Sequence, residues 1–326
     1  MQARLQSHMF TAVLCAAVLA GTPAVAQTYP AKPVKLIVGF AAGGPTDVIA
    51  RVLAQDMTAM LGQSVIVDNK TGANSLIATE AVARAVPDGY TLLFASLSHN
   101  VNAILLEKPP YHPLKDFAPV NLTAVLPLLV VTRPSTPVNS VQDLIKLAKA
   151  RPGEVTYGSA GNGGSAHLAG ALLETTSGAR MTHVPFRGNA PALTDVMGGQ
   201  VTFMFYPMIG VADLVAGKKL KVLAVGTAKR HPDYPAVPTM AESGFAGFEE
   251  TAPWVGMLAP AGTPVAIVNS LNDAIHKSLA KPETKERLKG LGAIPVGDPP
   301  AKFTEFLKAD AARWARVIKA AGVKAE

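Results

Sequence analysis

Short apolar segments alternate with amphipathic ones along most of the chain. Residues 34–40 form a compact apolar run that predicts a buried strand, and the glycine-rich sequence AAGGP follows at 41–45. From residue 46 the apolar positions recur at helical spacing, so a helix is predicted directly after the loop. A strand, a glycine-rich loop and a helix in this order are typical of a βαβ unit.

The same alternation continues to the end of the chain, and a second glycine-rich loop, GSAGNGGS at 158–165, repeats the design of the first. It follows a predicted strand and precedes a predicted helix. Further strands are predicted at 65–67, 91–95, 125–132, 155–157, 181–185, 201–205, 220–225 and 254–259. Further helices are predicted at 75–86, after Ser98-His99-Asn100, and at 141–150, 166–176, 190–197, 211–216, 265–279, 282–288 and 300–321.

We expect an α/β fold with mixed, mostly parallel sheets flanked by helices. A length of 326 residues favours two domains, given about 100–200 residues per domain. The helix-rich tail is expected to pack back on the first domain. The predicted organisation is a first domain of residues 27–126 plus 251–326 and a second domain of residues 127–250, with the crossings near 126 and 250.

Residues 1–26 have the parts of a signal peptide: Arg4 in a short n-region, an apolar stretch at 9–21, and an Ala24-Val25-Ala26 cleavage site. The stretch is shorter than the ~20 apolar residues of a membrane span, which disfavours an anchor. Cys15, the only cysteine, lies within it, so the remaining 300 residues form no disulfide. We expect export to the periplasm, where ATP, NAD and CoA chemistry is improbable, and therefore no cofactor.

Composition and charge exclude several classes of protein. With 49% apolar and 16% charged residues, the chain can bury a large core, and intrinsic disorder is disfavoured. The net charge of +7 is scattered along the sequence, and aromatic residues are only 6% and are not clustered with the basic ones. A nucleic-acid-binding protein usually shows a basic stripe with aromatic residues, so no nucleic-acid partner is expected.

The two glycine-rich loops are the features that carry chemistry. Each lies between the carboxyl end of a strand and the N-terminus of a helix, where α/β proteins place their ligands. Unpaired backbone N–H groups and the helix dipole favour a carboxylate or phosphate there. The alternative is that the glycines only permit tight turns, with Asp47 and Ser165 as helix caps. Short polar residues near these strand ends favour binding: Thr46, Asp47, Ser96, Ser98, Asn100, Ser159, Asn162 and Ser165.

Several enzyme motifs match only in part. The first loop has P-loop glycine spacing, but Pro45 stands at the position of the lysine. The second loop resembles a dinucleotide fingerprint, yet Arg187 follows the next strand instead of an acid. A secreted α/β serine hydrolase using Ser165 remains the enzyme alternative, because residues 163–167 come close to a G-x-S-x-G elbow. Residues two apart on a helix, such as Ser165 and His167, point away from each other, which disfavours that alternative. The remaining histidines show no zinc-ligand spacing, so no metal is expected.

From residue 29 to about residue 321 the chain resembles the Bug-type extracytoplasmic solute receptors of tripartite tricarboxylate transporters. The resemblance is carried by IVGFAAGGPTD at 37–47, PDGY at 87–90, YGSAG at 157–161, SAHL at 165–168, VPFRG at 184–188, PALTD at 191–195 and APAGTP at 259–264. It implies a two-lobed periplasmic binding protein (type II-like) rather than an enzyme. Such a receptor captures a small carboxylate, either a di- or tricarboxylate or an aromatic carboxylate, between its lobes and delivers it to a membrane permease. We expect it to be a monomer.

The resemblance also implies the ligand-binding residues. The first clamp comprises Ala42, Gly43, Gly44, Thr46 and Asp47; the second comprises Ser159, Gly161, Asn162, Gly163, Ser165 and His167; and Ser96, Ser98, Arg187 and Gly188 surround the cleft. One position departs from the family, since Tyr206 stands where an aspartate often receives a ligand amine. An amino-acid ligand is therefore less expected than a ring-bearing or aliphatic dicarboxylate.

Overall fold

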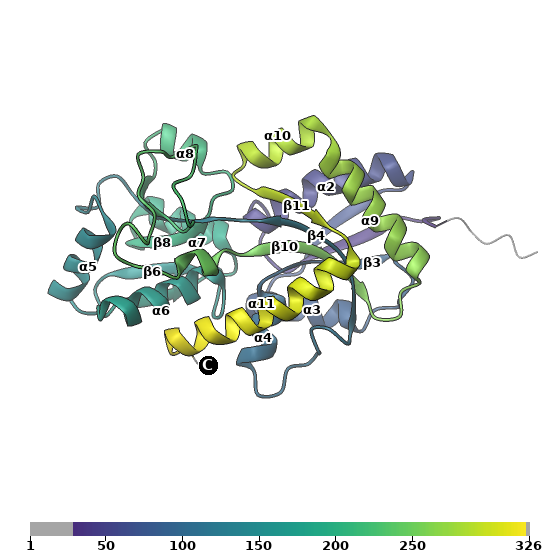
Figure 1. Cartoon of the computed structure of the whole chain (residues 1–326), viewed down its shortest axis with the longest axis horizontal. Coiled ribbons are helices and arrows are strands. Elements are labelled where there is room, and N and C mark those ends of the chain that lie inside the picture. Colours follow the sequence, from purple (N-terminus) through teal and green to yellow (C-terminus); the bar gives the residue numbers. More distant parts are fainter. Residues whose placement is uncertain (1–28, 324–326) are drawn as a thin grey trace, which may run out of the picture. The chain divides into compact units, whose positions relative to one another are not determined.

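The computed structural model describes residues 29–323, so the predicted signal peptide and Cys15 lie outside the described residues. The large compact unit begins at Lys32 and contains two β-sheets flanked by helices (Figure 1). Among the described residues, no helix combines the length and the apolar character needed to cross a membrane.

The first sheet has six strands in the order β11-β4-β10-β3-β1-β2. They are β1 (Val34–Val38), β2 (Val65–Asn69), β3 (Thr91–Ser96), β4 (Phe117–Val125), β10 (Trp254–Pro260) and β11 (Ile294–Asp298). Strands β1, β2 and β3 are parallel, whereas β10 runs antiparallel to both β3 and β4 and β11 runs antiparallel to β4.

The second sheet has five strands in the order β7-β6-β8-β5-β9. They are β5 (Leu128–Thr132), β6 (Thr156–Ser159), β7 (Thr182–Pro185), β8 (Phe203–Pro207) and β9 (Lys221–Val225). Strand β6 is parallel to β7 and β8, whereas β5 is antiparallel to β8 and β9. Among the described strands of this sheet, β5 is therefore the only one in the opposite direction. Both sheets are therefore mixed, with most strands in one direction.

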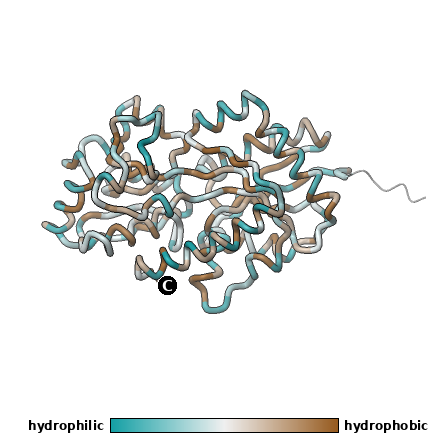
Figure 2. The backbone as a smooth tube through the Cα atoms, viewed as in Figure 1, coloured by the Kyte–Doolittle hydropathy of each residue, from teal (hydrophilic) through white to brown (hydrophobic). Residues whose placement is uncertain are grey.

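The helices connect these strands much as the periodicity predicts. They are α2 (Pro45–Leu61), α3 (Leu76–Ala83), α4 (Ser98–Leu105), α5 (Val141–Ala150), α6 (Ser165–Ser177), α7 (Asn189–Gly198), α8 (Ala212–Ala216), α9 (Val265–Ala280), α10 (Pro282–Gly290) and α11 (Pro300–Ala321). Short 3-10 turns occupy Ala73–Ser75 and Phe248–Thr251. Figure 2 shows hydrophobic residues along the strands, whereas α10 is largely hydrophilic.

The structure differs from the sequence prediction at the first crossing between the sheets. The single strand predicted at 125–132 is the end of β4 and all of β5, which belong to different sheets and are separated by Leu126-Pro127. The chain returns to the first sheet between β9 and β10. The predicted boundaries near 126 and 250 fall in these two connections; the division into two domains there remains a prediction.

Each sheet has its own apolar core. Trp254, Phe303 and Trp314 are fully buried beside the first sheet, and Tyr157, Phe203 and Phe205 are buried in the second. Helix α11 contacts both cores: Val317 packs with the first, which also includes Leu168 of α6, and Ala321 packs with the second. Burying a large apolar side chain contributes about 1.5–3 kcal/mol, so these contacts hold α11 firmly in place.

A buried polar cluster joins α11 to the first sheet. Asp310, which is 2% exposed, accepts hydrogen bonds from Trp254 Nε1 and Asn100 Nδ2, both at 2.9 Å, and forms an ion pair with Arg313. Burial raises the pKa of Asp310 above its ordinary value, while Arg313 and the two hydrogen bonds oppose the shift. Asn100, one of the polar residues expected near the ligand, instead serves this cluster.

Candidate functional site

The two glycine-rich loops have nearly the same backbone geometry. Gly43 and Gly163 both take a left-handed conformation, with φ of 78° and 75°, which a glycine adopts without strain. The glycines that follow them and cap α2 and α6 are both extended, with φ and ψ of −76° and 166° at Gly44 and −68° and 159° at Gly164. The repeat seen in the sequence is therefore a repeat of structure.

The third residue of each helix braces its loop. Asp47 Oδ2 accepts the N–H of Gly43 at 2.8 Å, and His167 Nδ1 accepts the N–H of Gly163 at 2.9 Å. Both side chains reach back four residues to the left-handed glycine. Asp47 and His167 thus hold the loops, and their predicted part in binding a ligand remains a prediction.

The carboxylate of Asp47 is 1% exposed and has two further partners. Arg51 Nε lies 3.0 and 2.9 Å from its two oxygens, and Asn69 Nδ2 donates to Oδ1 at 2.9 Å. Burial alone would raise the pKa of Asp47, but the hydrogen bonds from Arg51, Gly43 and Asn69 bring it below its ordinary value. The brace is therefore ionised at neutral pH.

The second loop is held by neutral groups. The His167 ring stacks on His183, with centroids 3.9 Å apart and planes 7° apart, and His183 Nε2 lies 2.6 Å from Ser159 Oγ. Ser159 Oγ in turn bonds both the N–H and the carbonyl of Gly161. Burial and the neighbouring His167 lower the pKa of His183 to about 3, so this imidazole is uncharged at neutral pH.

The geometry bears on the serine-hydrolase alternative. His167 Nδ1 is engaged by Gly163, and no hydrogen bond joins Ser165 to a histidine among the described residues. The close Ser159–His183 contact involves a serine that is 0% exposed within β6. The arrangement holds a loop in place and lacks the exposed nucleophile that acyl transfer needs.

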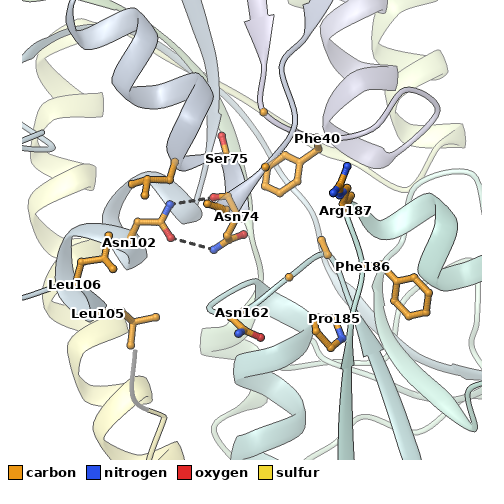
Figure 3. Close-up of a pocket in the computed structure, with 16 residues that line it drawn as sticks. Phe40, Asn74, Ser75, Asn102, Leu105, Leu106, Asn162, Pro185, Phe186 and Arg187 are labelled. Carbon is orange, nitrogen blue, oxygen red and sulfur yellow. Dashed lines mark hydrogen bonds between the residues drawn. The ribbon is translucent and has the colours of Figure 1, made fainter. Parts of the chain in front are cut away.

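A cavity of about 320 Å³ lies between the second glycine-rich loop and the segments that follow β1 and β2 (Figure 3). Its walls come from the Ala73–Ser75 turn, the end of α4 and the segment after β7. The lining residues are Gly39, Phe40, Gly72, Ala73, Asn74, Ser75, Leu76, Asn102, Leu105, Leu106, Ala160, Gly161, Asn162, Pro185, Phe186 and Arg187.

A second, smaller cavity of about 30 Å³ lies where α2 and α6 begin. Thr46 and Ser165, in the first turns of the two helices, both line it, together with Ser96 and Ser98 from the end of β3 and start of α4. Helix geometry leaves the N–H groups of a first turn without a carbonyl of their own helix, so both helices offer donors here. Phe40, Asn74 and Ala160 line both cavities.

The predicted site residues fall into groups. Gly161, Asn162 and Arg187 line the larger cavity; Thr46, Ser96, Ser98 and Ser165 line the smaller one; and Asp47, Ser159 and His167 hold the loops. Gly188 approaches the first loop, because a Cβ there would lie 3.1 Å from Ala41. Gly44 is buried and caps α2, whereas Ala42 and Gly43 are exposed.

Tyr206 is placed apart from these groups. It is 4% exposed on β8, where it packs in an apolar cluster with Leu129 and Val225, and burial raises its pKa to about 12. The lining of the two cavities does not include Tyr206, although its neighbour Pro207 lines the smaller one. Its influence on the choice of ligand remains a prediction.

Sequence reasoning missed the Ala73–Ser75 turn and the apolar wall. Phe40, Leu105, Leu106 and Phe186 line the larger cavity, but each stands in a segment whose pattern indicates an ordinary strand or helix end. The only signal for the turn is the GAN sequence at 72–74, since glycine and asparagine tolerate left-handed backbone.

The electrostatics of the two cavities favour an anion. Arg187 is the only charged side chain among the described residues that line them, and no aspartate or glutamate is among those residues. Among the described residues, no group of three or more His, Cys, Asp or Glu side chains could hold a metal ion. The available binding groups are backbone N–H donors, hydroxyls, amides and one guanidinium.

The sequence and the fold are similar to those of known proteins. The family model described as "Tripartite tricarboxylate transporter family receptor" matches residues 49–323. Protein BugT of Bordetella pertussis is 39% identical over 304 residues, covering 93% of each chain. The structure of the periplasmic binding protein BugD superposes with a TM-score of 0.87 and 37% identity, covering 91% of this chain and 100% of BugD.

A further solved structure, R. palustris Rpa4515 with adipate, also has a TM-score of 0.87 and 37% identity, over 91% of this chain and 99% of that one. The two mixed sheets flanked by helices are thus those of periplasmic binding proteins. The chain belongs to the tripartite tricarboxylate transporter receptor family, the Bug-type solute receptors.

Proposed function

We propose that the protein is a periplasmic receptor that captures a small carboxylate between its two glycine loops and delivers it to a membrane permease of the tripartite tricarboxylate type. The observation that carries the proposal is the convergence of Thr46 and Ser165, from the first turns of two helices, on one small cavity. Two helix N-termini aimed at one point favour a carboxylate there. The adipate bound to Rpa4515 supports this ligand class.

In this proposal the carboxylate sits at the helix N-termini and the rest of the ligand extends into the larger cavity. Backbone N–H groups and hydroxyls balance the charge, with Arg187 near the other end. Because the ligand is bound mainly by neutral dipoles, with one guanidinium, little of the desolvation cost of a tight ion pair arises, and the ligand can be released. No bond is made or broken, so the protein acts as a receptor and not as an enzyme.

Closure of two lobes is the proposed capture step. The connections near 126 and 250 would serve as hinges, and the ligand would bridge the loops that follow β1 and β6. The signal peptide predicted at 1–26 supports action in the periplasm, as does the match to periplasmic binding proteins. We propose that the receptor meets the permease as a monomer.

The test is a thermal unfolding screen of residues 27–326, freed of ligand by refolding, against succinate, adipate, citrate, benzoate, glutamate and a neutral ester. A ligand at a thousandfold its Kd adds about 4 kcal/mol, which shifts the Tm of a protein of this size by several degrees. We expect stabilisation by one class of carboxylate. Consumption of the ester with no carboxylate shift would instead favour the hydrolase.

Delivery to a permease needs a separate test in cells. Deleting the receptor gene should abolish high-affinity uptake of the acid identified in the screen, and a plasmid copy should restore it. A Gly44→Trp receptor is the matched negative control, because a Cβ on residue 44 would already lie 3.3 Å from the Ala41 carbonyl oxygen and the indole would fill the space beyond it. Unchanged uptake without the receptor would contradict the transport role.

A further inference from the structure

The Ala73–Ser75 turn has an unusual backbone. Ala73, Asn74 and Ser75 take φ values of 45°, 49° and 71°, all in the left-handed region that side chains other than glycine seldom adopt. Lys218, with φ of 52°, is the only other such residue in the described part of the chain. Backbone strain of this kind is maintained where the surrounding structure enforces it, often at ligand sites.

Contacts from two helices hold the turn. Asn102 of α4 donates through Nδ2 to the carbonyl of Asn74 at 2.9 Å and accepts from Asn74 Nδ2 at 3.2 Å. Thr79 of α3 donates to the carbonyl of Ser75 at 2.9 Å. Ser75 also fits against Gly39 so closely that a Cβ on Gly39 would lie 1.8 Å from its hydroxyl. The orientation of the Asn74 amide is therefore fixed before any ligand binds.

The fixed amide leaves one atom unused. Asn74 is 9% exposed, and its Oδ1 accepts no hydrogen bond from any residue that the structure describes. It faces the second glycine loop, 3.6 Å from the position of a Cβ on Gly164. In Figure 3 the Asn74 amide stands between Asn102 on one side and Phe40 on the other, with Asn162 below it. A buried acceptor without a donor is costly and calls for an explanation.

The position of Asn74 relates this acceptor to the ligand. Asn74 lines both cavities. When the ligand carboxylate is held at the helix N-termini, the carbon atoms next to the carboxyl group would therefore lie beside Asn74. An ionised carboxylate has no proton to donate to Oδ1, whereas a hydroxyl does. A ligand ammonium group would also donate, but no acidic side chain lines either cavity in the described chain to balance its charge.

Resting on the proposed function, we propose that Asn74 is a specificity-determining residue that accepts a hydrogen bond from a hydroxyl close to the ligand carboxylate. The preferred ligand is then a hydroxycarboxylate. The remainder of the ligand meets Phe40, Leu76, Leu105 and Phe186, so an apolar body is accommodated as well as a short aliphatic one. The selectivity of Asn74 depends on Asn102, which positions the amide.

The experiment is isothermal titration of the ligand-free wild-type protein with two matched pairs of acids, malate against succinate and mandelate against phenylacetate. One buried hydrogen bond predicts that the hydroxy acid binds about tenfold or more tightly than its partner in at least one pair. Asn74→Gly should remove this difference while the acid without a hydroxyl keeps its affinity. Asn74→Asp, which sets a negative charge at the same place, should weaken all carboxylates.

Two features keep the test interpretable. Glycine suits the left-handed backbone of residue 74, so Asn74→Gly removes the amide without straining the turn. Lys218→Gly makes the same kind of change at an exposed left-handed residue remote from both cavities, and it should leave every affinity unchanged. Circular dichroism verifies that each variant is folded.

The outcomes separate this proposal from the proposed function. Equal affinities within both pairs, tighter binding of the acids without a hydroxyl, or a preference that survives in Asn74→Gly would overturn the role of Asn74 and leave the receptor function standing. If none of the acids in the pairs or in the thermal screen binds, both proposals fail together.

Discussion

Replacing Asp47 with alanine tests the idea that each glycine loop is held by the third residue of its helix. The substitution leaves three donors without their acceptor: the N–H of Gly43, Nδ2 of Asn69 and Nε of Arg51. Gly43 is exposed and Asn69 is half-buried, so the loss is that of the hydrogen bonds themselves, and a hydrogen bond to a charged group contributes about 1.5–3 kcal/mol. The Arg51 side chain is 50% exposed and regains water, so it adds little. We expect Asp47→Ala to lower the free energy of unfolding by about 2–4 kcal/mol.

Urea denaturation at pH 7 measures this loss, and the Tm should fall by roughly 5–10 °C. Asp68→Ala is the matched control, since Asp68 is exposed one residue before Asn69 and should change stability by less than about 0.5 kcal/mol. Because the pKa of Asp47 is lowered on folding, its contribution is complete at neutral pH and is lost as the pH falls through the folded pKa. An Asp47→Ala protein as stable as the Asp68→Ala protein would refute the brace.

Three further predictions concern stability and the second loop. Burial lowers the pKa of His99 to about 4, so the folded protein binds a proton at this imidazole less readily than the unfolded chain does. The free energy of unfolding should therefore fall as the pH drops below 6.5, by about 2 kcal/mol at pH 5. Urea midpoints that rise on acidification would contradict this prediction. Asp310→Asn can keep its carbonyl oxygen toward Trp254 and Asn100, which both donate to Oδ2, but its NH2 group then faces Arg313 and the ion pair is lost. The cost should be about 3 kcal/mol or more, whereas an unchanged urea midpoint would show that the cluster contributes nothing. Gly163→Ala places a Cβ at a φ of 75° and 2.8 Å from Leu105, so calorimetry should find weaker carboxylate binding, and full affinity would argue against close approach of the second loop.

Local signals are enough to predict those parts of the fold that depend on a single stretch of the sequence. The strand-loop-helix units around Gly43 and Gly163 are of this kind, because the apolar run, the glycines and the helical periodicity lie together in the sequence. Strand β11 escapes prediction because it is short, half-exposed and contains Pro295 and Gly297. Strand β4 escapes it because Pro119 and Asn121 interrupt its apolar pattern.

The parts of the site that escape prediction depend on contacts between distant segments. The left-handed turn at Asn74 exists because Asn102 bonds it from 28 residues away. The role of His167 follows from its bond to Gly163 and its stacking on His183, and only the first of these is local. The sequence identifies such residues as polar and near a loop, whereas their orientation is set by tertiary packing.

The most direct test of the account is the backbone amide NMR spectrum of the ligand-free protein, titrated with the carboxylate that stabilises it most in the thermal screen. If two helix N-termini bind the carboxylate, the amide resonances of Thr46 and Ser165 should both move and saturate with one common Kd, while that of Asp68 stays in place. Saturation that leaves Thr46 and Ser165 unmoved and shifts amides elsewhere would contradict the central claim.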